Sequence, residues 1–274
     1  MTILKAGSYA IDNSGNDNTF FLDLQHNSII SHSATKIVAS SSSGDTKYVF
    51  TGTNFGHFKS NGSPQSGTIT GIAAYSTHDG SLGYSLTHLH LSVSDFDSYT
   101  HSNNISGFYT DIFSGADTIT GSGKADTLYG YDGSDAITGG AGADKITPGA
   151  GSDTVIYEAV SDSTSSHFDT IRGFDFDGAD KIDFSFTVHK IETRVGSGTL
   201  SKSSFDHDLA HAINASHLGA HDAVLFTPNH GTYAGETFLI VDANGSAGYQ
   251  AGHDYVIELD HSVHLSSLDV HDFE

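Results

Sequence analysis

The sequence predicts an all-β protein in which a parallel β-roll of nine-residue repeats is flanked by an N-terminal β module and a β-rich C-terminal cap with one short helix. Short segments rich in Thr, Ser, Ile, Val and Phe, separated by Gly, Asn and Ser, fill the first third. Apolar runs and a single amphipathic segment fill the last third. Between them, aspartate recurs every nine residues, at Asp117, Asp126, Asp135, Asp144 and Asp153. We expect three parts: 1–108, 109–190 and 191–274.

The N-terminal module is predicted to consist of strands, for example Lys47 to Gly52, Gly67 to Ala74 and Leu82 to Val93. Residues 85–91 read Ser-Leu-Thr-His-Leu-His-Leu, so the leucines are expected on a buried face and the histidines on an exposed one. Ser94 is expected to cap a short helical turn that ends near Tyr99.

The central repeats match the nonapeptide pattern of a β-roll, in which each unit forms a loop and then a short strand with one inward apolar residue. Two residues after each aspartate comes Ile119, Leu128, Ile137, Ile146 or Val155. Two units make one turn, so residues eighteen apart stack. Asp117, Asp135 and Asp153 form one predicted row, and Asp126 and Asp144 form the other. Asp162, nine after Asp153, is expected to continue the second row.

This arrangement predicts metal sites made only of oxygen. Glycines permit positive φ, so loop carbonyls can turn inward beside the stacked carboxylates. Such cages favour calcium, which accepts six to eight flexible oxygens, over magnesium, and they make folding depend on the ion. A metal-free β-helix is the alternative. Lys124 and Pro148 depart from the glycine pattern. Besides the stacked aspartates, the predicted ligating positions are Gly130, Asp132, Gly133, Gly139, Ala141, Gly142, Gly149 and Gly151.

Charge and composition narrow the function classes. The formal net charge is −22, from 33 acidic and 11 basic residues, which argues against nucleic acid or an anionic membrane as partner. There is no cysteine, so disulfides and thiolate metal sites are excluded. We find no N-terminal signal peptide and no run of the ~18 apolar residues that a membrane span requires.

The C-terminal part is predicted to close the open end of the roll. Leu200 to Ala215 reads as a helix capped by Ser203 or Ser204, and it precedes strands at 223–227, 237–242 and 255–259. Asp242-Ala-Asn244-Gly-Ser246 resembles the start of an EF-hand loop but lacks its later Gly and Glu. We interpret it as a turn, with calcium binding as the alternative.

Histidine is abundant, with 18 residues. His207, His211 and His217 have the spacing of a metzincin zinc motif, although Asp208 replaces the general-base Glu and Met1 is the only methionine. Exposed histidines on a helix are the default interpretation, and zinc binding is the alternative. His88 with His90, and His261 with His264, are weaker metal candidates.

The segment Gly115 to Tyr157 resembles the repeats-in-toxin (RTX) family of calcium-binding proteins exported by type I secretion. The stretch from Phe168 to Ser185 is similar to the segment that ends the roll in serralysin-type C-terminal domains. This resemblance implies that Asp169 and Asp180 close the last calcium site. It also implies a secreted, extracellular protein with an uncleaved C-terminal signal and the type I secretion machinery as partner, although the Asp272-Phe273-Glu274 end lacks the usual apolar finish.

We therefore expect a secreted, non-enzymatic calcium-binding protein that acts in adhesion or in surface or matrix association, with an unknown partner. Two alternatives stay open. One is a histidine-based transition-metal or haem-binding protein, and the other is a secreted hydrolase whose active site lies in 1–108.

Overall fold

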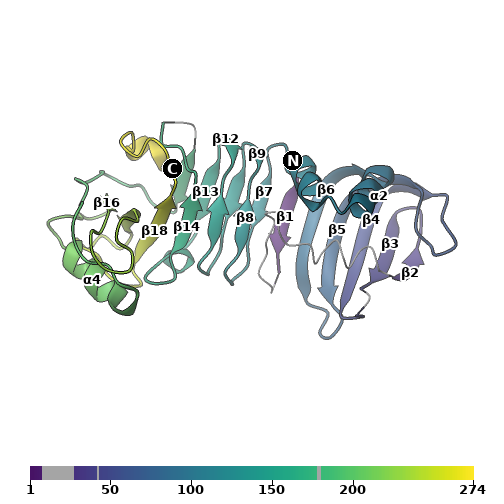
Figure 1. Cartoon of the computed structure of the whole chain (residues 1–274), viewed down its shortest axis with the longest axis horizontal. Helices are drawn as coiled ribbons and strands as arrows, with labels where there is room; N and C mark the ends of the chain where they lie inside the picture. Colours follow the sequence, from purple (N-terminus) through teal and green to yellow (C-terminus); the bar gives the residue numbers. More distant parts are fainter. Residues whose placement is uncertain (8–27, 42, 178–179) are drawn as a thin grey trace.

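The computed structural model describes residues 1–7, 28–41, 43–177 and 180–274. The molecule is elongated, with the roll in the middle, the N-terminal module at one end and the C-terminal cap at the other (Figure 1). Its described strands form a ten-stranded sheet, a six-stranded sheet and a two-stranded sheet. The all-β class with a central parallel roll is confirmed.

The roll is built from two stacks of short parallel strands. Neighbouring strands pair eighteen residues apart, for example Ile137 with Ile119 and with Val155, because two nine-residue units complete one turn. The apolar residue at the centre of each strand is fully buried between the two stacks. One stack contains β7 (Thr118–Thr120), β10 (Ala136–Thr138), β13 (Thr154–Tyr157) and β15 (Lys181–Phe184); the other contains β8 (Thr127–Tyr129), β11 (Lys145–Thr147) and β14 (Asp169–Arg172). Two loop strands, β9 (Asp132–Gly133) and β12 (Ala150–Gly151), also pair in parallel.

The regular period ends after Tyr157, and here one prediction is wrong. Asp162 does not continue the second row; it lies in a 3-10 turn, Val160–Asp162, and its Oδ2 accepts the N–H groups of Glu158 and Ala159. The preceding residues contain no glycine, so the chain forms a local turn in place of another glycine loop. β14 takes the next place in the second stack instead.

The N-terminal module extends one face of the roll. Its strands are β1 (Ile3–Ala6), β2 (Ser28–His32), β3 (Lys36–Ser40), β4 (Thr46–Gly56), β5 (Ser66–Ser76) and β6 (Leu82–Ser92). β1 pairs antiparallel with β6 on one side and parallel with β7 on the other. One continuous sheet therefore runs from the module into the roll (Figure 1).

The predicted alternation in β6 is confirmed, with a bulge that the pattern did not reveal. Leu86, Leu89 and Leu91 are buried, and His88 and His90 are exposed. His88 adopts a positive φ of 61°, and the register with β5 shifts here. The bulge returns the later leucines to the same face as Leu86.

The helical turn predicted at 94–99 is longer and is followed by a second helix that was not predicted. α2 covers Val93–Ser102, and its N-cap is Ser92, whose side chain accepts the N–H of Asp95. α3 covers Ile105–Ile112 and crosses the expected boundary at 108. Each helix is short, so its apolar periodicity was too brief to recognise.

The cap places a fully buried sheet between two cores. β16 (Ala223–Phe226), β17 (Phe238–Asp242) and β18 (Asp254–Asp260) are antiparallel, and β18 pairs in parallel with β14 of the roll. Along β17, Leu239 and Val241 face the main core, and Phe238 and Ile240 face a second core. This burial on both faces explains the unbroken apolar runs of these strands.

The single helix of the cap is shorter than predicted. A 3-10 turn, Lys202–Ser204, precedes α4 (Phe205–Ala212), whose N-cap is Ser204, and Leu209 is buried in the second core. A final 3-10 turn, Val270–Asp272, leads to a bridge between Phe273 and Ile182 at the edge of β15. Within the described ranges, no helix has the length and apolarity needed to cross a bilayer.

Candidate metal sites

The repeated aspartates form two hydrogen-bonded ladders along the edges of the roll. In each step, the backbone N–H of one aspartate donates to Oδ1 of the aspartate one turn later. For example, the nitrogen of Asp117 lies 2.8 Å from Oδ1 of Asp135, and the nitrogen of Asp144 lies 2.8 Å from Oδ1 of Asp169. The first ladder contains Asp117, Asp135, Asp153 and Asp180; the second contains Asp126, Asp144 and Asp169. Each carboxylate is therefore held at one orientation by the backbone.

The other carboxylate oxygen is left without a partner in most of these residues. Oδ2 is buried and accepts no hydrogen bond in Asp117, Asp135, Asp144, Asp153 and Asp169. A buried, unpaired charge of this kind is costly, and stacked like charges add repulsion. The ladders are therefore favourable only when a proton or a positive ion lies beside each of these Oδ2 atoms.

Two of the four ladder ends are different. Oδ2 of Asp126 accepts the N–H of Ser122 at 2.6 Å and its hydroxyl at 3.0 Å. Oδ2 of Asp180 accepts the N–H of Asp175 at 3.0 Å. These two carboxylates are already satisfied by the protein, so the demand for a cation is concentrated at the other five.

The same burial changes the acidity of the inner carboxylates. Burial raises the pKa of Asp135 and Asp144 to about 7 and that of Asp153 to about 6, against the lowering effect of the backbone N–H groups. Burial raises the pKa of Asp169 to about 9, and the backbone N–H of Asp144 acts in the opposite direction. Without a metal, these groups favour protons, so a bound cation has to displace them.

Backbone oxygens line the space between successive loops. A Cβ atom added to Gly133 would lie 2.2 Å from the carbonyl oxygen of Gly115, and one added to Gly151 would lie 1.4 Å from that of Gly133. Both glycines have φ near 150°, which other residues rarely adopt. In the second ladder, Gly142 is packed in the same way: a Cβ atom added to it would lie 2.6 Å from the carbonyl oxygen of Lys124.

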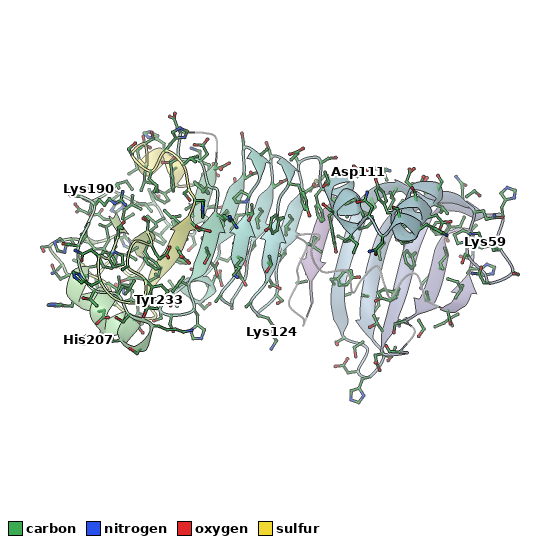
Figure 2. The ribbon with its side chains drawn as sticks, in the orientation of Figure 1. Lys59, Asp111, Lys124, Lys190, His207 and Tyr233 are labelled. Atoms are coloured by element: carbon green, nitrogen blue, oxygen red, sulfur yellow. The ribbon has the colours of Figure 1, made fainter. Side chains whose placement is uncertain are left out.

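The first glycine of each loop keeps space open beside the carboxylate of its own repeat. A Cβ at Gly121, Gly130 or Gly139 would lie 2.8, 2.6 or 2.5 Å from Oδ2 of Asp126, Asp135 or Asp144. A side chain here would occupy the position that an ion needs. Lys124, which replaces a later glycine, is exposed and points away from the roll, so the loop accommodates it (Figure 2).

The donors present fit calcium. Each gap between stacked loops offers two ladder carboxylates and several carbonyls, which is a flexible set of hard oxygen ligands. Across the described part of the chain, three or more His, Cys, Asp or Glu side chains do not gather into a metal-binding group. A cage with two carboxylates and backbone carbonyls needs no such group. Two other predicted positions are exposed. Asp132 begins β9, and its charge contributes to the raised pKa of Asp135. Ala141 lies in a loop of the second ladder.

The structure gives the predicted zinc site no support. His207 and His211 are exposed on α4, and His207 lies on the outer side of the cap (Figure 2). Nδ1 of His217 instead contacts the carbonyl oxygen of Ala212 at 2.7 Å. Among the described residues, these three rings do not converge into a metal-binding group.

Comparison with known proteins agrees with this geometry. The family model of the RTX calcium-binding nonapeptide repeat matches residues 111–146, 132–155 and 138–162. No curated protein matches the chain. Two solved structures are similar, the AlgE6R3 and AlgE6R2 subunits from the Azotobacter vinelandii mannuronan C5-epimerase. Each is 26% identical in sequence. The match to AlgE6R3 covers 59% of this chain and 74% of that subunit, with a TM-score of 0.37. The match to AlgE6R2 covers 57% of this chain and 78% of that subunit, with a TM-score of 0.33.

Proposed function

We propose that this RTX-type calcium-binding protein is secreted and non-enzymatic, that its roll folds when extracellular calcium fills the ladders, and that its N-terminal module attaches it to a surface or matrix. The observation that carries the proposal is the set of five buried Oδ2 oxygens without a partner. They make the ion part of the fold, because the ladders are unfavourable without it.

Dependence on calcium supports an export role for the roll. At low intracellular calcium, repulsion along the ladders and a net charge of −22 favour an unfolded chain. An unfolded chain without cysteine is suited to passage through a type I exporter. Outside the cell, calcium at about 10⁻⁴ to 10⁻³ M is in the range that extracellular modules use. Folding after export then follows from the change in calcium concentration alone.

The N-terminal module contains a cavity suited to recognition. It has a volume of about 500 Å³ and lies between α2 and the sheet, with Ile37, Phe50 and Ile69 among its buried apolar lining residues. Lys59 and Asp97, whose charged groups are 3.6 Å apart, also line it. Volumes of a few hundred Å³ with apolar walls and few polar groups are typical of ligand sites. We assign surface recognition to this cavity.

The folding part of the proposal is tested by circular dichroism and calorimetry of the full chain in calcium and in excess chelator. Calcium should increase β-structure and raise the melting temperature, and the chelator should reverse both changes. An identical spectrum and melting temperature in the two conditions would exclude a calcium-dependent roll.

The recognition part needs a separate experiment. Retention of the calcium-loaded chain on a panel of cell-surface and matrix polysaccharides can be compared between the wild type and Ser63→Trp, which places a bulky ring in the cavity lining. The variant should lose retention while keeping its calcium-dependent melting. Equal retention of both proteins would remove the cavity from the proposal.

A further inference from the structure

The carboxylates of the roll share a structural signature: one oxygen accepts a backbone N–H, and the other is buried without a partner. Among the described aspartates outside the roll, Asp242 alone has an unpartnered buried oxygen. Its Oδ2 accepts the N–H of His221 at 2.6 Å, and its Oδ1 has no hydrogen-bond partner. Asp242 is 0% exposed. The cap therefore contains a carboxylate in the same state as those of the ladders.

A second carboxylate lies next to it. Asp254 is the cross-strand partner of Asp242 at the open end of β17 and β18, and it is also 0% exposed. It accepts the N–H of Gln250 at 2.6 Å and that of Ala243 at 3.3 Å. In the part of the chain that the structure describes, neither aspartate forms an ion pair. Two adjacent buried carboxylates are unfavourable unless a proton or a cation neutralises them.

The backbone around the pair holds both carboxylates in place. The connection between the two aspartates, residues 243–253, turns back on itself, and its Ala243 and Gln250 amides both donate to Asp254, whereas the N–H of His221 donates to Asp242. The ring of His221 packs against Gly245, where an added Cβ would lie 2.9 Å from Nε2. This imidazole does not join the two carboxylates in a metal-binding group of three. The side-chain ligands available here are therefore two carboxylates, as in a roll gap.

We propose that Asp242 and Asp254 bind a calcium ion inside the C-terminal cap, at a site separate from the roll. The site uses the start of the Asp242-Ala-Asn244-Gly loop, whose Asn244 side chain is already engaged with the N–H of Ser246 at 2.8 Å. The two aspartates are therefore the side-chain ligands, and loop carbonyls or water complete the shell. Burial raises the pKa of Asp254 to about 7, as it does for Asp135 in the roll, so an ion at this site has to displace a proton.

The position of this site gives it a role in closing the roll. β18 begins at Asp254 and pairs in parallel with β14, where Ile257 lies opposite Asp169 of the second ladder. An ion that ties the start of β18 to the end of β17 thus stabilises the strand that covers the last rung of that stack. Calcium then acts on the roll and on its cap together.

The test is a count of calcium ions per chain in the full-length protein, by native mass spectrometry with calcium in excess. Asp242→Asn and Asp254→Asn should each bind one calcium fewer than the wild type. Asp260→Asn, which changes a more exposed carboxylate in the same strand, is the matched control and should keep the full number. The calcium-induced change in circular dichroism should persist in all four proteins. Its absence in the wild type would instead contradict the calcium-folded roll.

An unchanged count in Asp242→Asn and Asp254→Asn would overturn the proposal. If, in addition, the melting temperature of Asp254→Asn changed less with pH near 7 than that of the wild type, a proton shared by the two aspartates would be the correct description. Should either variant fail to fold, crystals of the wild type soaked in terbium decide the matter. An anomalous peak between Asp242 and Asp254 supports the site, and peaks confined to the roll exclude it.

Discussion

The backbone N–H of Thr2 donates to Oδ1 of Asp117, which is the contact that each aspartate makes with the next one along a ladder. The N–H of Thr118 returns to the carbonyl oxygen of Thr2 at 3.0 Å, as that of Ala136 does to Asp117 at 2.9 Å. β1 is therefore the first rung of the roll, although 115 residues separate Thr2 from Asp117. Leu4 takes the place of the inward apolar residue, opposite Ile119.

This relationship predicts that the module and the roll unfold as one unit. Leu4→Ala should lower the free energy of unfolding by about 2 to 5 kcal/mol, because it empties a buried position at the junction. In calorimetry with calcium, the single transition of the wild type should separate into two. Lys5→Ala, an exposed change in the same strand, should leave one transition. Two transitions already present in the wild type would contradict the coupling.

The ladder geometry predicts that Asp135 and Asp162 have unequal roles. Asp135 lies between two gaps of the first ladder, so Asp135→Asn should weaken calcium binding at least about tenfold, equivalent to about 1.4 kcal/mol. Asp162→Asn should change the affinity little, because the Asp162 side chain accepts the N–H groups of Glu158 and Ala159, and the side-chain oxygen of Asn can accept them too. Calcium titration followed by circular dichroism measures both. Equal losses in the two variants would return Asp162 to the ligand set.

Stacking of the loops predicts a strong effect of one added methyl group. Gly151→Ala should destabilise the calcium-loaded protein by at least about 2 kcal/mol, because the new Cβ meets the Gly133 carbonyl oxygen and φ is 149°. Gly123→Ala is the control in another repeat, since an added Cβ there meets no atom within 4 Å. Denaturant unfolding in calcium compares them. Similar stability of the two variants would show that the loops are less closely stacked.

The raised pKa values of the ladder aspartates predict that stability depends on pH in opposite directions with and without calcium. In the folded, metal-free chain, burial raises the pKa of Asp135 and Asp144 to about 7, above the value of 3.8 expected when unfolded. Their protonated forms stabilise this state at low pH, and that stability is lost as pH rises from about 4 through 7.

Calcium needs the deprotonated carboxylates, so its affinity should increase over the same interval. The melting temperature should therefore fall with pH in chelator and rise with pH in calcium. Calorimetry from pH 4 to pH 8 in both conditions measures this. Curves that change in the same direction would show that these aspartates do not exchange protons for the ion.

The sequence by itself determined the regular part of this protein: the two rows of aspartates, the inward apolar residue of each strand and the oxygen chemistry of the gaps. These follow from a local rule, because a nine-residue unit that stacks in parallel fixes its neighbour eighteen residues away. Thr2 could not be placed in this way, since its partner at Asp117 is distant and its own segment has no repeat.

Only the tertiary structure decided where the regular part ends. Asp169 and Asp180 complete the ladders after steps of 25 and 27 residues, which differ from the eighteen residues of a regular turn, although family resemblance had indicated both residues. The buried state of Asp242 likewise depends on the packing of β17 and β18 between two cores. The physical reason is that a repeat encodes contacts between copies of itself, whereas the contacts that start, stop and cover the repeat are made by unrelated segments brought together by burial of apolar surface.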